Sequence, residues 1–225
     1  MTTAKVFIQR LVISSLFAMT VAACGQGSAP QPERAGQAKQ APPDISGIWG
    51  AQLLPSLSDD PPLLPEAAKA FKNLDPESDP LAICKPPGLP RLMDLAFQFE
   101  IVQTPKVVYF LMEYGQHMRR IYIDGKHPEN PDPTWFGHSI GHWKGRTLVV
   151  DTVGFNGHSW LDMVGHPQSD SLHLVERYTL SEDGKSLKQE NVIDDPKTYS
   201  RPWETVTKTY PRAPGPILEY ICETI

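Results

Sequence analysis

From Ile45 onward the chain is built of short apolar or alternating runs with turn residues between them, and this pattern constrains the fold most strongly. An alternation with a period of two places every second side chain on one face of a strand. Turns such as Asp124-Gly125 and Lys144-Gly145 contain residues that accept tight or left-handed backbone geometry. The pattern predicts an all-β domain of antiparallel strands over residues 46–50, 97–103, 107–114, 117–123, 139–143, 147–153, 172–180, 186–193, 203–210 and 217–222.

Strands at such short spacing are expected to form a meander of about eight to ten strands, each paired with the next. Closing that sheet into a barrel removes its exposed edges. The opening strand contains Gly47-Ile48-Trp49 and resembles the Gly-x-Trp strand of lipocalin-like (calycin-like) barrels, where the tryptophan covers one end. A core tryptophan in a two-sheet sandwich is the alternative. One short helix is expected over residues 66–74, between Pro65 and Asp75-Pro76.

The first 23 residues have the pattern of a lipoprotein signal peptide. Lys5 and Arg10 form a positive segment, residues 11–19 are mainly apolar, and Val21-Ala22-Ala23-Cys24 matches the bacterial lipobox, whose cysteine is acylated. An ordinary signal peptide is the alternative. We expect a lipid on Cys24 that anchors the protein in the cell envelope. Gly25 is not the aspartate that holds many lipoproteins at the inner membrane, which favours the outer membrane, facing the periplasm.

Residues 24–43 are rich in Gly, Pro, Gln, Ala and Ser and contain too few apolar residues for a core, so we expect a disordered tether. Residues 44–225 then form a single β-barrel domain. Removal of residues 1–23 deletes two basic residues and no acidic one, which changes the formal charge from -5 to -7. An acidic surface argues against a nucleic-acid partner and leaves the lipid as the contact with the membrane.

Two cysteines, Cys84 and Cys222, remain once Cys24 is acylated. The cell envelope is oxidising, and such a pair usually forms a disulfide there. We therefore predict a bond between the segment before the barrel and the last strand, with two buried thiols as the alternative.

Residues 154–171 connect two predicted strands and form a loop far longer than a hairpin requires, which is typical of a functional loop. Six of the seven histidines lie between positions 127 and 173. Imidazole titrates near neutral pH and a neighbouring carboxylate fixes its tautomer, so this mixture favours acid/base catalysis. The candidate catalytic residues are His166, His173, Asp170, Asp162 and Glu176, and the candidate ligand-binding residues are His138, Asp151, Asn156, Trp160, Arg119 and Arg120.

Two other interpretations of the same residues stay open. The polar groups can form a structural rim that holds the loop over a non-catalytic ligand site. The histidines can also bind a metal, and His138 and His142 share one face of a strand, but the spacings typical of metal sites are missing. We therefore expect no metal and no other cofactor.

Two strands carry charged residues at positions expected to be apolar. Glu176 shares a face with Leu174 and Tyr178, and Asp151 interrupts a similar apolar face. Arg119 and Arg120 point to opposite faces, so one of them can point inward and bind a carboxylate. For Asp151 an internal bridge of this kind is preferred to catalysis, and for Glu176 both roles are open.

The chain resembles a family of exported bacterial proteins through Asp132-Pro-Thr-Trp-Phe-Gly-His-Ser-Ile-Gly-His-Trp143, Thr147-Leu-Val-Val-Asp-Thr-Val-Gly-Phe-Asn156 and Gly165-His-Pro-Gln-Ser-Asp-Ser-Leu-His-Leu-Val-Glu-Arg177. The resemblance implies membership and export but no particular activity. It places His142 and His158 outside the shared pattern, which weakens a metal site built on His142. It places at pattern positions His138, Asp151, Asn156, Trp160, Asp162, His166, Ser169, Asp170, His173 and Glu176.

Together these observations lead to one hypothesis and two alternatives, of which a structural envelope protein with a filled barrel leaves the long loop 154–171 unexplained. The hypothesis is a lipid-anchored barrel whose mouth, roofed by residues 154–171, carries out cofactor-free acid/base chemistry on a small, partly apolar molecule. Hydrolysis, elimination and isomerisation all fit. The other alternative is a non-catalytic lipoprotein with the same barrel that binds or carries a small ligand.

Overall fold

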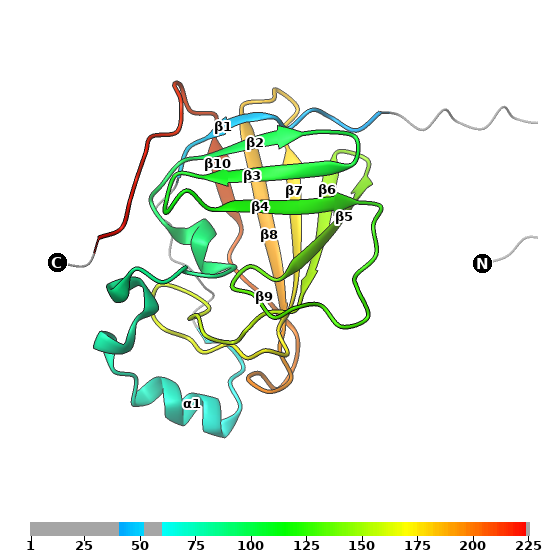
Figure 1. Cartoon of the computed structure of the whole chain (residues 1–225). Coiled ribbons are helices and arrows are strands. Elements are labelled where there is room, and N and C mark those ends of the chain that lie inside the picture. The colour runs from blue at the N-terminus through cyan, green and yellow to red at the C-terminus, as the bar shows by residue number, and fades with distance from the viewer. Residues whose placement is uncertain (1–40, 52–59, 224–225) are drawn as a thin grey trace, which may run out of the picture. The chain divides into compact units, whose positions relative to one another are not determined.

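The structure is a computed structural model that describes residues 41–51 and 60–223 (Figure 1). The predicted signal peptide, Cys24 and nearly all of the predicted tether lie outside these residues. Within the described ranges the chain forms one α-helix, α1 (Pro65–Lys72), three short 3-10 helices, and ten strands. The strands are β1 (Gly47–Trp49), β2 (Phe99–Gln103), β3 (Val107–Met112), β4 (Met118–Ile123), β5 (His138–Lys144), β6 (Thr147–Val153), β7 (His173–Leu180), β8 (Ser186–Asp194), β9 (Trp203–Glu204) and β10 (Lys208–Pro211).

All ten strands belong to one curled sheet in the order β1-β2-β3-β4-β5-β6-β7-β8-β10, and β9 pairs with another part of β8. The two ends of this order meet. The Gly50 amide donates to the Pro211 carbonyl at 2.8 Å, and the Ala213 amide donates to the Ile48 carbonyl at 3.0 Å. These bonds satisfy backbone groups that an open edge would expose. The structure confirms the predicted all-β, barrel-like fold with one short helix.

The expectation of an antiparallel meander throughout is wrong at one place, because β4 and β5 are parallel. Ile121 pairs with Ser139 and Tyr122 with Ile140 in this register. Parallel neighbours need a crossover of about a dozen residues or more, and residues 124–137 provide it. The Thr134 amide fixes the crossover by donating to the Gly154 carbonyl at 3.0 Å.

The C-terminal part of the chain also differs from expectation. The predicted strand 203–210 is divided into β9 and β10, since residues 205–207 leave the ladder. Residues 217–222 form no strand, and Tyr220 makes one isolated bridge with Tyr114. Pro214 and Pro216 precede this segment and lack the amide hydrogen that a ladder requires. The predicted Cys84–Cys222 disulfide is present, but Cys222 lies in this irregular segment instead of a last strand.

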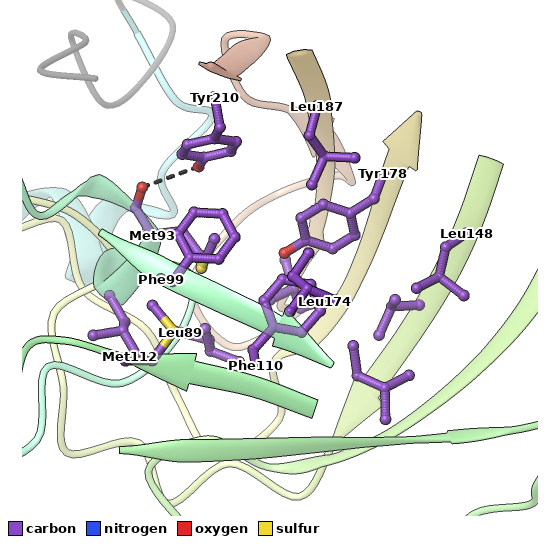
Figure 2. Close-up of a cluster of buried hydrophobic side chains, with 14 of the residues drawn as sticks. Leu89, Met93, Phe99, Phe110, Met112, Leu148, Leu174, Tyr178, Leu187 and Tyr210 are labelled. Atoms are coloured by element: carbon purple, nitrogen blue, oxygen red, sulfur yellow. Dashed lines mark hydrogen bonds between the residues drawn. The ribbon is translucent and has the colours of Figure 1, made fainter. Parts of the chain in front are cut away.

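The inward faces of the strands pack into one core (Figure 2). The ring centroids of Phe99 and Phe110 lie 5.7 Å apart, and those of Phe110 and Tyr178 lie 5.2 Å apart. The Tyr210 hydroxyl donates to the Met93 carbonyl at 3.0 Å, which connects β10 to the segment that precedes β2. Large aromatic side chains of this kind bury much apolar surface, so they fill the space between the strands.

Trp49 lies in the core near the point where the two ends of the sheet meet. Its side chain is fully buried, and its Nε1 donates to the Ile45 carbonyl at 3.1 Å. The Arg212 guanidinium lies over the indole with its central carbon 4.4 Å from the ring centroid, and its Nη1 donates to the Ser46 carbonyl at 2.7 Å. These contacts fix the tryptophan where β1 meets the segment that follows β10.

Helix α1 lies beside the barrel and starts and ends slightly earlier than predicted (Figure 1). Pro65 occupies its first turn with Glu66, while Lys69 and Lys72 lie in its last turn, so the charges suit the helix dipole. Phe71 of this helix stacks on the ring of His166 in the loop 154–171. No helix in the described part of the chain is long and apolar enough to cross a membrane.

Candidate functional site

The predicted site residues do not gather at one barrel mouth. They divide among the barrel interior, the loop 154–171 and the outer face of the sheet, and each group has its own partners.

Arg119 and Glu176 form an ion pair in the barrel interior. The carboxylate accepts from both terminal nitrogens of the guanidinium, and the Nη1–Oε1 distance is 3.1 Å. Arg119 also donates to the Ser139 hydroxyl at 3.2 Å and to the Thr152 hydroxyl at 3.0 Å. The structure thus confirms that one of the two neighbouring arginines points inward, and Arg120 lies exposed on the opposite face.

The interior ion pair continues into a hydrogen-bonded network. The Tyr178 hydroxyl donates to Glu176 Oε1 at 2.7 Å, and Gln189 Nε2 donates to the same oxygen at 3.1 Å. Tyr210 Oη lies 2.6 Å from Gln189 Oε1. Burial and the Glu176 carboxylate hold the pKa of Tyr178 and of Tyr210 well above the usual range, so both hydroxyls stay protonated as donors. These contacts support an internal bridge as the role of Glu176.

Asp162 and His166 form a second, separate pair inside the loop. Asp162 Oδ1 accepts the backbone amides of Val164, Gly165 and His166 at 3.1, 2.9 and 3.0 Å. Its other oxygen, Oδ2, lies 2.6 Å from His166 Nδ1. The His166 ring also stacks on Phe71 of α1, with centroids 4.1 Å apart. Asp162 is fully buried and His166 is 8% exposed, so this pair holds the loop against the helix.

Three further candidates have local partners. Asp170 is exposed and binds the Lys197 ammonium at 2.5 Å. The Trp160 ring lies 5.0 Å from the central guanidinium carbon of Arg91, and the Asn156 side chain accepts the amide of the residue two positions later. These contacts shape the loop, and they do not converge with one another on one point.

The third group lies on the outer face of the sheet, on three neighbouring strands. Asp151 Oδ2 lies 3.0 Å from His173 Nε2, and Asp151 Oδ1 lies 3.0 Å from His127 Nε2. The Nδ1 atoms of His127 and His138 are 2.9 Å apart. We call His127, His138, Asp151 and His173 the histidine–aspartate cluster. Its members are partly accessible: the side chain of His173 is 40% exposed and that of Asp151 is 34% exposed.

Asp151 faces outward and therefore does not form the internal bridge that the sequence suggested for it. The inward positions of β6 belong to its buried residues Leu148, Val150 and Thr152. The register pairs Asp151 with Ile140 on β5 and with Val175 on β7. His138 and His173 lie two residues from those partners on the same face, so both are diagonal neighbours of Asp151.

Sequence reasoning counted His127 among the histidines but did not assign it to the site. This residue lies on the crossover between β4 and β5, which carries it over the outer face of the sheet. The crossover approaches the end of β6 closely at Gly154, where an added Cβ would lie 2.9 Å from Pro131. The signal that could have found His127 is the length of residues 124–137, since a hairpin needs far fewer.

The hydrogen bonds of the cluster determine its proton positions. Burial raises the pKa of the Asp151 carboxyl, but the hydrogen bonds from His173 and His127 and their charge outweigh burial, and the pKa lies below its usual value. An ionised carboxylate accepts only, so both histidines donate through Nε2–H. His127 Nδ1 then accepts from His138 Nδ1–H. Among the described residues, no hydrogen bond reaches His138 Nε2 or His173 Nδ1, so each of these nitrogens keeps a free lone pair.

A groove of about 220 Å³ lies elsewhere on the surface, lined by Arg177, Glu190, Asn191, Val192, Glu204, Thr205 and Thr207. None of the predicted site residues line it. Within residues 41–51 and 60–223, no group of three or more His, Cys, Asp or Glu side chains is arranged to hold a metal ion. We centre the candidate site on the histidine–aspartate cluster, because its side chains lie within hydrogen-bond distance of one another and are partly accessible.

No protein-family model and no curated protein matches the chain. The resemblance to a family of exported bacterial proteins therefore stays a prediction.

Proposed function

We propose that this protein catalyses cofactor-free acid/base chemistry on a small, partly apolar molecule at the histidine–aspartate cluster. The observation that carries the proposal is that Asp151 binds His173 directly and binds His138 through His127. One carboxylate thus orients two imidazoles that have free nitrogens. One ring can remove a proton from the substrate while the other, once protonated, returns a proton. That pair of steps is common to hydrolysis, elimination and isomerisation.

Each residue has a distinct role in this mechanism. His138 is the first candidate for the base, since burial and the neighbouring His127 lower the pKa of its imidazole and leave it neutral at neutral pH. His127 connects Asp151 to His138, because its Nε2–H donates to Asp151 and its Nδ1 accepts from His138 Nδ1–H. Asp151 holds the tautomers and stabilises the imidazolium that forms. Positioned acid/base groups of this kind typically accelerate a reaction by roughly 10²–10⁴-fold.

The filled interior favours this proposal over a carrier. A barrel that carries a small ligand needs a cavity, whereas Arg119, Glu176, Tyr178 and Gln189 bind one another inside this one. A ligand bound among them would have to break a buried ion pair. The cluster, in contrast, is accessible from the outer face. We further propose that Cys24 anchors the protein in the envelope, where the site would meet molecules of the periplasm.

The activated ester 4-nitrophenyl acetate is a suitable probe, because an unprotonated imidazole promotes its hydrolysis. The full chain should hydrolyse it faster than free imidazole of equal concentration does. His138→Gln and Asp151→Asn should each lower kcat/KM by about tenfold or more, since the first removes the base and the second its orienting charge.

His142→Gln is the matched control, because His142 lies on the same strand, faces outward and is exposed, yet belongs to no part of the cluster. It should leave the rate unchanged. Equal rates in the wild-type chain, His138→Gln and Asp151→Asn, with all three folded by circular dichroism, would refute the proposal.

A further inference from the structure

Strand β4 presents two outward side chains beside the histidine–aspartate cluster that the mechanism above does not use. Arg119 and Ile121 point inward and are buried, whereas Arg120 and Tyr122 alternate with them and are exposed. Tyr122 is 40% exposed, so part of its ring is accessible to a ligand.

The parallel register places both side chains next to His138. Ile121 pairs with Ser139 and Tyr122 with Ile140, so one step back along each strand Arg120 is level with His138. The rings of Tyr122 and His138 are stacked, with centroids 5.3 Å apart and an interplanar angle of 16°. Arg120 and Tyr122 therefore lie on one side of the ring whose Nε2 is the proposed base.

The chemistry of the two side chains specifies a ligand class. Arg120 takes part in no ion pair among residues 41–51 and 60–223, so its guanidinium is available to an anion. The guanidinium fork matches a carboxylate, to which it can donate two parallel hydrogen bonds. A tyrosine ring offers an apolar face to another planar ring. Residues two apart on a strand are separated by about 6.6 Å, which suits a ring joined to a carboxylate by a short linker.

We propose that Arg120 and Tyr122 form the substrate-binding part of this site and that the substrate is an aromatic carboxylate. This inference rests on the proposed function, because it places the substrate by its contact with His138. Arg120 binds the carboxylate, Tyr122 packs against the ring, and the linker between them lies closest to His138 Nε2, where proton transfer would occur.

Binding of three probes to the full chain, measured by calorimetry or by NMR titration, tests the inference. trans-Cinnamate has both features, cinnamyl alcohol lacks the carboxylate, and 3-cyclohexylpropionate lacks the aromatic ring. Cinnamate should bind about tenfold more tightly than either of the others. Arg120→Gln should weaken cinnamate binding about tenfold and leave cinnamyl alcohol unaffected. Tyr122→Leu should weaken both aromatic probes and leave 3-cyclohexylpropionate unaffected.

Arg177→Gln provides the matched control, because Arg177 also faces outward, on β7, but lies four residues beyond His173. It should leave cinnamate binding unchanged. The inference is overturned if cinnamate binds no more tightly than the other two probes, or if Arg120→Gln and Arg177→Gln weaken it equally.

The binding readout is independent of the ester hydrolysis that tests the proposed function. If cinnamate binds with the expected dependence on Arg120 and Tyr122 while His138→Gln leaves ester hydrolysis unchanged, the proposed function fails and the binding site stands. If hydrolysis depends on His138 while cinnamate fails to bind, the substrate class is wrong and the proposed function stands.

Discussion

The Nδ1 atoms of His127 and His138 face each other at 2.9 Å, so one of the two rings must donate a proton to the other. His127 Nε2 lies 3.0 Å from the ionised Asp151 carboxylate, which requires a proton on that nitrogen. In the neutral rings, His138 is therefore the donor. We expect nitrogen-15 NMR at about pH 8 to find His138 protonated at Nδ1 and both His127 and His173 at Nε2.

The variant Asp151→Asn tests the cause of these tautomers. The amide that replaces the carboxylate both donates and accepts, so the fixed preference for Nε2–H at His127 and His173 should weaken. Tautomer ratios identical to those of the wild-type chain would show that Asp151 does not set the proton positions. His142 provides an internal reference, because it is exposed and, among the described residues, makes no hydrogen bond to Asp151.

The pH dependence follows from the lowered pKa of His138. Burial and the neighbouring His127 hold this pKa below 6.5, the ring of Tyr122 stacks on that of His138, and the strand register places Arg120 level with His138. A base must be neutral to act, so kcat/KM should rise with pH and level off with a midpoint below 6.5. A midpoint at or above 6.5 in the wild-type chain would exclude His138 as the base.

The lowered pKa of His138 also makes the free energy of unfolding depend on pH. Between the lowered pKa and 6.5 the unfolded chain binds a proton at His138 more readily than the folded chain does. The stabilising contribution is therefore complete above about pH 6.5 and is lost as the pH falls through this window. His138→Gln should reduce the decrease in the free energy of unfolding between about pH 7 and pH 5, as measured by urea titration.

The ion pair between Arg119 and Glu176 predicts a strong effect of single substitutions. Arg119→Met or Glu176→Gln leaves the other group buried without its partner, which should lower the free energy of unfolding by about 3–5 kcal/mol. The double variant Arg119→Met with Glu176→Gln should lower it less than the sum of the two single changes, because no charge is left buried. Single variants as stable as the wild-type chain would contradict the buried bridge.

Much of this fold follows from local sequence. Alternation alone places Glu176 on the same face as Leu174 and Tyr178, and the neighbouring positions of Arg119 and Arg120 require that one of them point inward. The parallel pairing of β4 and β5 does not follow in the same way, because Asp124-Gly125 is equally typical of a hairpin turn. The crossover is held by contacts such as Thr134 with Gly154, which only the tertiary structure brings together.

In the candidate site, too, some features follow from local sequence and others depend on tertiary contacts. His166 and His173 look alike in sequence, since each is close to an aspartate, and the structure separates them. His166 is covered by Phe71, a residue 95 positions earlier in the chain, whereas His173 remains on the open outer face. His127 likewise reaches the cluster only because the crossover 124–137 carries it over the outer face of the sheet. Local patterns indicate which side chains are polar, but burial depends on residues distant in sequence.

The lipid anchor remains a prediction, because Cys24 lies outside the described residues. The lipobox predicts that the wild-type chain fractionates with membranes and that Cys24→Ser abolishes acylation. Fractionation followed by mass spectrometry of the N-terminal peptide measures both effects. A Cys24→Ser chain that is still processed normally and still fractionates with membranes would show that the protein is held there by something else.

The different surroundings of His166 and His173 predict opposite effects of the same substitution. In His166→Gln the buried Asp162 loses a partner at 2.6 Å and Phe71 loses a stacked ring, so the free energy of unfolding should fall by about 1–3 kcal/mol. The rate of hydrolysis of 4-nitrophenyl acetate should then change little in the folded variant. His173→Gln should leave the melting temperature unchanged and lower kcat/KM. The reason is that His173 is exposed and binds Asp151 at the candidate site. If His166→Gln instead lowers kcat/KM at unchanged melting temperature, the reacting groups lie in the loop 154–171, and the histidine–aspartate cluster on the outer face has a structural role.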